Sequence, residues 1–166
     1  AGREDVDTRM LGDGRLCVIE IVRPINRYGG FRKFEKKVRD LSSGRVEVDA
    51  LKVVDSSYVT MVKEAAFDKE YRAYVKFDGE VTPERLNLLG DLIPVIDQRT
   101  PKRVSHRRAD AIRRRRIYSI IYEGMEDDLH VFRIKTEAGT YIKELVSGDG
   151  GRTRPSFAEV IGANAE

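Results

Sequence analysis

The sequence predicts an α+β fold: a mixed, mostly antiparallel sheet with flanking helices. Strand-like segments occur in neighbouring pairs, and the helical patterns between them are short and scattered. A doubly wound parallel sheet would instead show strands that alternate regularly with longer helices. The length of 166 residues predicts one domain that is large enough to bury a core. We therefore expect a single domain over residues 1–166.

Two strands and two helices are expected near the start of the chain. The segment 16–22, LCVIEIV, is apolar enough for a strand, and residues 45–54 alternate well enough for another. Apolar residues at helical spacing predict a helix over residues 31–41. A second, short helix is expected to begin at Ser56 or Ser57, because serine suits an N-cap, and to run through Ala66.

The rest of the chain predicts strands that pair around short helices. Residues 69–77 alternate with period two, which puts Tyr71, Ala73, Val75 and Phe77 on one face. A helix is expected to begin at Thr82-Pro83-Glu84, because proline suits the first helical position. The remaining expected elements are a short strand over 92–96, paired strands over 117–122 and 129–135, an extended-to-helical passage over 139–146 and a last helix over 155–161.

Positive charge is concentrated in residues 99–116, RTPKRVSHRRADAIRRRR. This segment has nine Lys or Arg residues and one acid, Asp110, whereas the rest of the chain has 22 basic and 27 acidic residues. Guanidinium groups match phosphate oxygens, so we predict that the segment binds a nucleic-acid backbone with a salt-sensitive affinity. A solvated charge run is the alternative. A second, weaker basic patch lies on the helix expected over residues 31–41 and consists of Arg32, Lys33, Lys36, Lys37 and Arg39. A solvated helix face and a contact with RNA explain this patch about equally well.

Several protein classes are excluded by what the sequence lacks. One cysteine, Cys17, forms no internal disulfide, and no set of Cys and His residues fits a zinc site. No apolar run approaches the roughly 18 residues of a membrane span, and no signal-peptide pattern opens the chain, so we expect a soluble, cytoplasmic protein. The sequence contains neither the P-loop pattern Gly-x-x-x-x-Gly-Lys-Ser/Thr nor a Gly-x-Gly-x-x-Gly pattern after a strand. It also has no signature of a serine or cysteine catalytic triad. The two histidines, His106 and His130, are far apart in sequence.

Three short motifs resemble those of pseudouridine synthases. Gly2-Arg3-Glu4-Asp5 resembles the G-R-x-D loop, which carries the catalytic aspartate of these enzymes. Lys69-Glu70-Tyr71-Arg72 resembles their K-x-Y-R strand. Gly139-Thr140-Tyr141-Ile142-Lys143 resembles their G-T-Y-I-R/K motif. The longer strings AGREDVD, RTPKRVSHRRAD and EAGTYIKELVSGDGGRTRPS resemble one family in particular. This is the archaeal and eukaryotic pseudouridine synthase 10 family, which modifies the T-arm of tRNA.

The resemblance implies roles for particular residues. It makes Asp5 the nucleophile, because neither Glu4 nor Asp7 falls in the G-R-x-D register. Lys143 would be the cation that keeps this carboxylate ionised, at a position where the family often has arginine. Tyr71 would stack on the flipped-out uracil and accept or relay its C5 proton. The expected RNA-binding residues are Arg3, Lys102, Arg103, Arg107, Arg108, Arg113, Arg114, Arg115 and Arg116.

The implied reaction is the isomerisation of uridine to pseudouridine at tRNA positions 54 and/or 55. It breaks the N-glycosidic bond and rejoins the base through C5, without a redox step, so no cofactor and no metal are expected. Attack by the carboxylate at C6 or at C1′ is left open. We expect tRNA as partner, with no membrane and no obligate protein partner. The alternatives are a non-catalytic RNA-binding module that uses the arginine-rich segment and a DNA-binding protein.

Members of the family usually carry an N-terminal RNA-binding domain with a cysteine-based metal site. We therefore expect this chain to be a C-terminal catalytic fragment. On its own it should form a stable domain with weak or no activity, because its catalytic loop lies at a free chain end.

Overall fold

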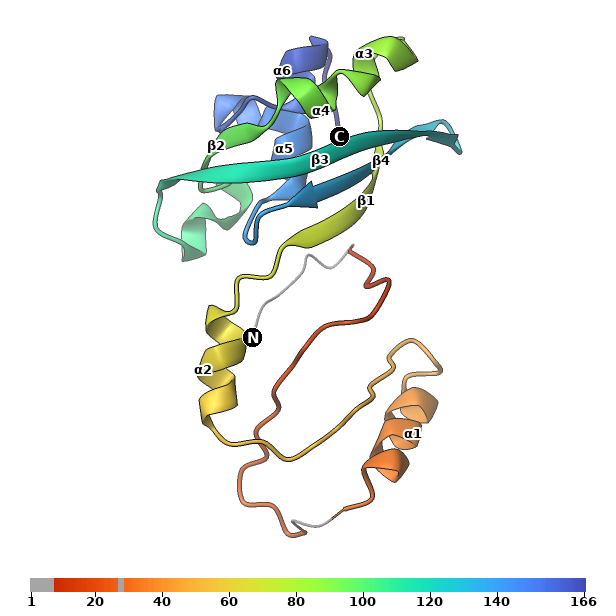
Figure 1. The fold of residues 1–166 in the computed structure, drawn as a ribbon, viewed down its shortest axis with the longest axis vertical. Coiled ribbons are helices and arrows are strands. Elements are labelled where there is room, and N and C mark those ends of the chain that lie inside the picture. Colours follow the sequence, from red (N-terminus) through yellow and green to blue (C-terminus); the bar gives the residue numbers. More distant parts are fainter. Residues whose placement is uncertain (1–7, 27–28) are drawn as a thin grey trace. The chain divides into compact units, whose positions relative to one another are not determined.

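The computed structural model describes residues 8–26 and 29–166 (Figure 1). Contacts within the chain divide it into two compact units, Ala1–Ala65 and Ala66–Glu166. We call them the N-terminal and C-terminal units and describe each by itself. The single domain expected over residues 1–166 stays a prediction.

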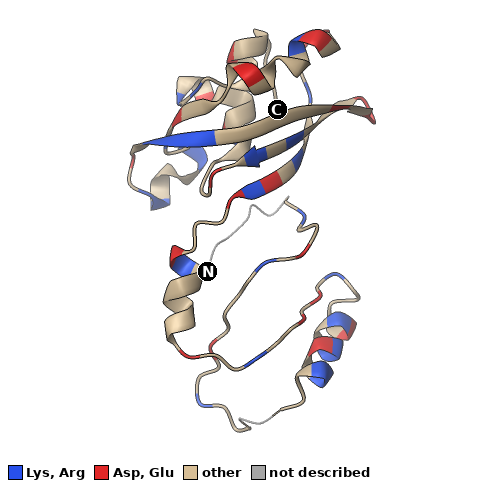
Figure 2. Ribbon diagram, viewed as in Figure 1, with Lys and Arg blue, Asp and Glu red and all other residues tan. Residues whose placement is uncertain are grey.

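The N-terminal unit contains two helices, α1 (Phe31–Leu41) and α2 (Ser57–Glu64). Both predicted helices are thereby confirmed, with α2 ending two residues earlier than expected. Neither helix contains a buried residue. Figure 2 shows α1 with blue basic segments next to red acidic ones.

Both strands predicted in the N-terminal unit are wrong. Residues 16–22 and 45–54 are irregular chain, and apolar side chains such as Ile19 and Val22 are exposed. A strand needs a partner to accept and donate its ladder hydrogen bonds, and no described strand pairs with either segment. Residues 45–54 begin instead with local bonds, because the Ser42 hydroxyl binds both the amide and the carbonyl of Val46.

The C-terminal unit is built on one five-stranded sheet with strand order β1-β4-β3-β2-β5. Every pair of neighbouring strands in it is antiparallel. This confirms the predicted fold class, α+β with an antiparallel sheet. The strands are β1 (Lys69–Val75), β2 (Val95–Arg99), β3 (Ile112–Glu126), β4 (Leu129–Thr136) and β5 (Thr153–Arg154).

Four short helices gather on one side of this sheet (Figure 1). They are α3 (Pro83–Asn87), α4 (Leu89–Leu92), α5 (Ile142–Ser147) and α6 (Phe157–Ile161). The core lies between them and the sheet: Phe132 of β4 is fully buried, and its ring meets that of Phe157 at a centroid distance of 5.1 Å. Leu145 of α5 belongs to the same cluster.

The alternation predicted for residues 69–77 is confirmed in β1. Val75 and Phe77 are buried in the core, and Tyr71 and Ala73 are half-buried, whereas Tyr74 is exposed on the opposite face. Tyr71 therefore lies on the side of the sheet that the helices cover. Its Cα pairs with that of Ile134 on β4.

Glycine is required where α4 approaches β3. A Cβ atom added at Gly90 would lie 2.9 Å from the backbone oxygen of Ile120, a distance that real Cβ atoms essentially never show. The close approach places Leu89 and Ile93, both fully buried, directly over the sheet.

The limits of β2 and β3 differ from the expected ones. The predicted strand over 92–96 lies at Val95–Arg99, because Leu92 still ends helix α4. Strand β3 begins at Ile112, five residues before the expected start at Ile117, so Arg113–Arg116 are strand residues that pair with β2. Extra pairing also shortens the turn between β3 and β4 to Asp127 and Asp128, both with positive φ, as a two-residue hairpin turn requires.

Candidate functional site

The predicted site residues are divided between the described and the undescribed parts of the chain. Asp5 and Arg3 lie outside the described residues. Tyr71 is half-buried on β1, and Lys143 is exposed in the first turn of α5, with both elements packed into the same core. The structure thus puts Tyr71 and Lys143 on the same side of the sheet.

The segment before α5, residues 139–141, makes a close turn against β3. Gly139 has a φ of +79°, a backbone conformation that favours glycine, and it lies beside the guanidinium of Arg115. Thr140 is buried, and its hydroxyl donates to the carbonyl of Glu137 at 2.8 Å. Arg115 in turn donates from Nη1 to the Glu137 carboxylate at 3.0 Å.

The side-chain amide of Gln98, on β2, forms hydrogen bonds with both the amide and the carbonyl of Tyr141. The Tyr141 amide donates to Oε1 of Gln98 at 2.8 Å, and Nε2 of Gln98 donates to the Tyr141 carbonyl at 3.0 Å. The same Nε2 also donates to the hydroxyl of Thr153 at 3.2 Å. Gln98 is 2% exposed, so its amide satisfies polar groups that water does not reach.

On the other side of Lys143, Glu144 forms a two-point ion pair with Arg103. Arg103 Nε donates to Oε1 of Glu144 at 2.7 Å, and Nη2 donates to Oε2 at 3.3 Å. Glu144 is 4% exposed, although it stands in the first turn of a short helix. The guanidinium of Arg103 also lies 5.7 Å from the ring centroid of Tyr141. Tyr141 is therefore bound by strand β2 through Gln98, and Glu144 is bound by the chain between β2 and β3 through Arg103.

The arginine-rich segment leaves the sheet after β2 and returns to it as β3. Between them lies the 3-10 helix η1 (Lys102–Arg107), and Thr100 closes the base of the loop. The Thr100 hydroxyl donates to the carbonyl of Ala109 at 2.7 Å and accepts from the amide of Ala111 at 3.1 Å and from Arg113 Nη1 at 3.0 Å. The loop is thus a defined projection from the sheet.

The acid in this segment, Asp110, neutralises two arginines at the base of the loop. Its carboxylate accepts from Arg99 Nε at 3.0 Å and from Arg152 Nη2 at 2.6 Å. These contacts, with that to Arg99 the largest, hold the pKa of Asp110 below its usual value. Asp110 therefore stays ionised and reduces the charge at the base rather than at the tip.

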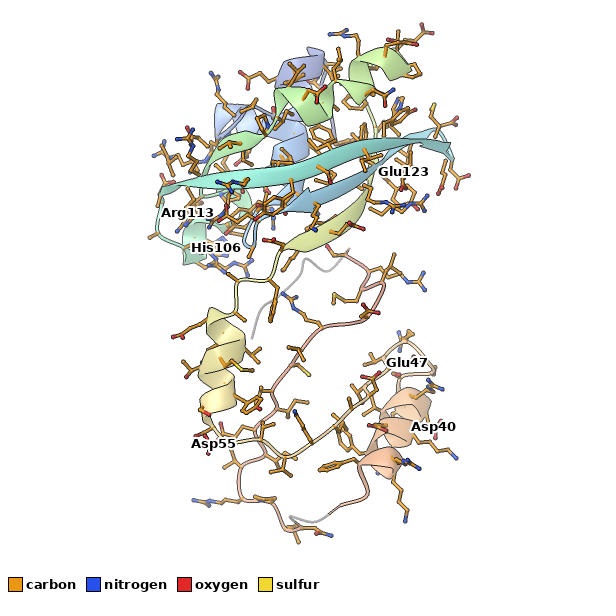
Figure 3. The ribbon with its side chains drawn as sticks, viewed as in Figure 1. Asp40, Glu47, Asp55, His106, Arg113 and Glu123 are labelled. Atoms are coloured by element: carbon orange, nitrogen blue, oxygen red, sulfur yellow. The ribbon has the colours of Figure 1, made fainter. Side chains whose placement is uncertain are left out.

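The basic residues of the segment divide into two groups. Arg99, Arg103, Arg113 and Arg115 bind Asp110, Glu144, Thr100 and Glu137 respectively. A second group is exposed, and its side chains make no hydrogen bond or ion pair to the part of the chain that the structure describes: Lys102, Arg107, Arg108, Arg114 and Arg116. Blue segments at the near end of β3 and in the adjoining loop mark this basic region in Figure 2, and Figure 3 places His106 and Arg113 there.

The division within Arg113–Arg116 follows the pleat of strand β3. Arg113 and Arg115 share a face with buried Ile117, whereas Arg114 and Arg116 point to the opposite face and are exposed. Arg114 lies opposite Asp97 in the ladder between β3 and β2. Lys102 is the first residue of η1, and its backbone amide donates to the Asp149 carboxylate at 2.9 Å.

A second charged cluster occupies the far end of the open sheet face. Arg72 of β1 and Arg133 of β4 pair across the strands, and each donates to Glu123 of β3, at 3.0 Å and 2.7 Å. These pairs, with that to Arg72 the largest, lower the pKa of Glu123. Figure 3 shows Glu123 at the end of the sheet opposite Arg113. Arg72 also forms an ion pair with Glu126, so the two arginines of the cluster are balanced by two glutamates, and the cluster lies away from the arginine-rich loop.

Sequence reasoning missed the residues that fix the site. Gln98 and Glu144 bind partners 43 and 41 residues away, and the pattern of the sequence does not report such pairings. One signal was available for Gln98: its spacing from Ile96 places a polar residue at a core-facing position of the strand. Among the described residues, no three His, Cys, Asp or Glu side chains gather as metal ligands would, and none of the described helices is long and apolar enough to cross a membrane.

The C-terminal unit is an α+β unit that concentrates exposed arginines in one loop and the adjoining strand. This concentration of positive charge suits the binding of a polyanion. The chain belongs to the Pus10 C-terminal family, because the model of that family, "Pus10, C-terminal", matches residues 1–166. The resemblance found in the three motifs is thereby confirmed.

Two relatives illustrate the similarity. The chain is 46% identical over 166 residues to the tRNA pseudouridine synthase Pus10 of Methanothrix thermoacetophila, covering 99% of this chain and 37% of the relative. It is 48% identical over 166 residues to the protein of the same name from Archaeoglobus fulgidus, covering 99% of this chain and 46% of the relative. The chain therefore spans less than half the length of these two relatives.

A solved structure is also similar in part. The chain matches a crystal structure of a Cbf5-Nop10-Gar1 complex with a TM-score of 0.46 and 29% identity. The match covers 61% of this chain and 29% of the other.

Proposed function

We propose that this chain carries the catalytic centre of a tRNA pseudouridine synthase, an isomerase that converts uridine to pseudouridine. The observation that carries the proposal is the family match over residues 1–166, together with relatives of that name at 46% and 48% identity. The three motifs that resemble pseudouridine synthases lie within the matched range. No cofactor is needed for this chemistry, because the base is released and rejoined without a net change of oxidation state.

Asp5 is the proposed nucleophile. Its carboxylate must remain ionised to attack, and a nearby cation favours the ionised form. Lys143 is the proposed cation, and its place at an ordered helix start supports this role: Gln98 binds the residue two before it, and Arg103 binds the residue after it. A side chain on a fixed backbone holds its charge at a constant position, which electrostatic stabilisation requires.

Tyr71 is proposed to stack on the extruded uracil and to accept or relay its C5 proton. Tyr71 is half-buried on β1, at the edge of the described sheet, and it shares its face of the strand with Ala73 and Val75, which pack into the core. A base that is extruded from its stack needs such an aromatic partner. Tyr71 and Lys143 lie on the same side of the sheet, as one site would require.

The exposed arginines are proposed to bind the phosphate backbone of tRNA. Arg107, Arg108, Arg114 and Arg116 present their guanidinium groups to solvent and have room for phosphate oxygens. Such contacts give affinity and register but do not read bases. We therefore assign T-arm specificity to the shape of the arm and its unstacked loop bases.

The experiment that tests this function maps the modified position. An unmodified tRNA transcript is incubated with the complete gene product, treated with a carbodiimide that marks pseudouridine and copied by reverse transcriptase. The proposal predicts a stop in the T-arm that is absent without protein. Stops elsewhere in the tRNA would contradict T-arm specificity. Tight tRNA binding without any stop would favour the alternative of a non-catalytic RNA-binding module, and equal affinity for duplex DNA would favour a DNA-binding protein.

A further inference from the structure

We infer that Arg103 is a positioning residue that orients Lys143 through Glu144, and that it is not one of the residues that bind tRNA phosphates. The inference rests on the proposed function and refines it, since the sequence alone groups Arg103 with the RNA-binding arginines.

Arg103 and Glu144 form a two-point ion pair. Two nitrogens of Arg103 face the two carboxylate oxygens of Glu144, at 2.7 Å and 3.3 Å, so the planar fork is engaged by a carboxylate. The Arg103 side chain is about one third exposed, and that of Glu144 is 6% exposed. To offer this edge of its guanidinium to a phosphate, Arg103 would have to leave a buried carboxylate unpaired, and that is costly.

The position of Glu144 in the chain connects this pair to Lys143. Glu144 directly follows Lys143 in the first turn of α5, a helix of only six residues. A helix this short has little stability of its own, so contacts from outside set its direction. Gln98 binds the residue that precedes the helix, and Arg103 binds the third residue after that one. Together they set where the Lys143 side chain begins.

Neighbouring arginines of the same loop differ from Arg103. Arg107 and Arg108, a few residues further along the same loop, are exposed and have no acidic partner among the residues that the structure describes. They suit phosphate binding, whereas Arg103 joins the loop to α5. The loop therefore has two functions: its exposed arginines bind RNA, and Arg103 fixes the helix that carries Lys143.

The test separates the rate of the chemical step from tRNA affinity in the complete gene product. Tritium release from tRNA labelled at C5 of uridine is measured in single turnover at saturating enzyme, and filter binding gives the Kd. The variants are Arg103→Gln, Arg103→Lys, Glu144→Gln and the double variant Arg103→Gln/Glu144→Gln. Arg133→Gln is the matched control, because it removes an ion pair with Glu123 at the other end of the sheet.

We expect Arg103→Gln and Glu144→Gln each to lower the rate constant by about tenfold to a hundredfold, as small displacements of catalytic groups do. The Kd should stay within about twofold of the wild-type value. Arg103→Lys should not restore the rate, because lysine keeps the charge but cannot form the two-point pair. The double variant should lose no more than the worse single variant, since both substitutions remove one interaction. Arg133→Gln should behave as wild type.

The pH dependence supplies a readout that a purely structural role would not move. If Lys143 is displaced, the Asp5 carboxylate loses part of the charge that favours its ionised form, so the acidic limb of the rate profile should move to higher pH in Glu144→Gln. Glu144→Gln is nearly isosteric and leaves no buried charge unpaired, so it remains informative if Arg103→Gln unfolds.

Two results would overturn the inference while leaving the proposed function intact. The first is a raised Kd with an unchanged saturating rate in Arg103→Gln, and the second is full activity in Glu144→Gln. A wild-type protein that binds tRNA but releases no tritium would overturn the proposed function, and the inference with it.

Discussion

The side-chain amide of Gln98 binds both the amide and the carbonyl of Tyr141, at 2.8 Å and 3.0 Å, and so replaces the ladder partner that a strand would provide at that point. The chain ends its extended path at Tyr141 and starts helix α5 with the next residue. A buried polar side chain thus fixes the helix start that bears Lys143. It links the predicted catalytic lysine to the strand from which the arginine-rich loop departs.

Replacement of this amide should be costly to stability. Gln98→Met keeps the length of the side chain but removes the partner of the Tyr141 amide and one of two hydrogen bonds to the Tyr141 carbonyl, which still accepts from the Leu145 amide. We expect a loss of about 1–3 kcal/mol in the free energy of unfolding. Urea denaturation measures it. The control is Asp97→Asn on the same strand, which is exposed and should change stability by less than about 0.5 kcal/mol. Equal stability of the two variants would refute the role given to Gln98.

The two groups of arginines should respond differently to substitution. Arg114→Gln removes an exposed guanidinium, so it should weaken tRNA binding and reduce the slope of log affinity against log salt by about 1, with unchanged stability. Arg113→Gln removes the bond to Thr100 at the base of the loop and should lower the thermal midpoint instead. Filter binding over a salt series and thermal unfolding distinguish the two. Identical effects of both substitutions would contradict the assignment of Arg114 to RNA binding and of Arg113 to the base of the loop.

The core should depend strongly on Phe132. Its ring is fully buried and meets the rings of Phe77, Tyr122 and Phe157. Phe132→Ala removes most of these contacts and leaves a cavity, so we expect a loss of about 3–5 kcal/mol. Denaturation of the C-terminal unit by urea, followed by circular dichroism, would measure the loss. A cost below about 1 kcal/mol would contradict the packing described.

Burial makes His130 a source of pH-dependent stability. Desolvation lowers the pKa of His130 from its usual 6.5, and the ring packs against Phe77 at a centroid distance of 5.3 Å. The unfolded chain therefore binds a proton at a higher pH than the folded chain. Stability should be full above about pH 6.5 and should fall as the pH drops below it.

The measurement is the free energy of unfolding between pH 5 and pH 7.5 for the wild type and for His130→Gln. The substitution should flatten the curve in this range. The carboxylates of Asp110 and Glu123 also have lowered pKa values, but their contribution is lost below about pH 4.5, outside the measured window. An unchanged slope in His130→Gln would assign the pH dependence to another group.

Local patterns predicted the elements that need only local information. Residues 31–41 form the expected helix because their apolar spacing describes a helix face, and β1 shows the expected alternation because it borders the core. The segment 16–22 has an equally apolar sequence but forms no strand, since strand formation depends on a partner. Arg113–Arg116 have no sequence pattern typical of a strand, but they form one because they pair with β2.

For the candidate site the sequence supplied candidate residues, and their roles stay predictions. Motif resemblance singled out Asp5, Tyr71 and Lys143, and charge clustering singled out the arginine-rich loop. The positions of Arg103 and Arg115 on acidic partners could not be derived, because Glu144 and Glu137 come close only when the sheet has formed. A count of charges gives the field of a segment, whereas the fold decides which charges remain available to a ligand.

The most direct test of the central proposal is tritium release from tRNA labelled at C5 of uridine, with wild-type protein and with Asp5→Asn, beside filter binding of the same tRNA. The substitution removes the proposed nucleophile and keeps its size. We predict release by the wild-type protein, none by Asp5→Asn, and similar tRNA affinity for both. Undiminished release by Asp5→Asn would contradict the assignment of the nucleophile, and binding without release by the complete wild-type protein would contradict the synthase itself.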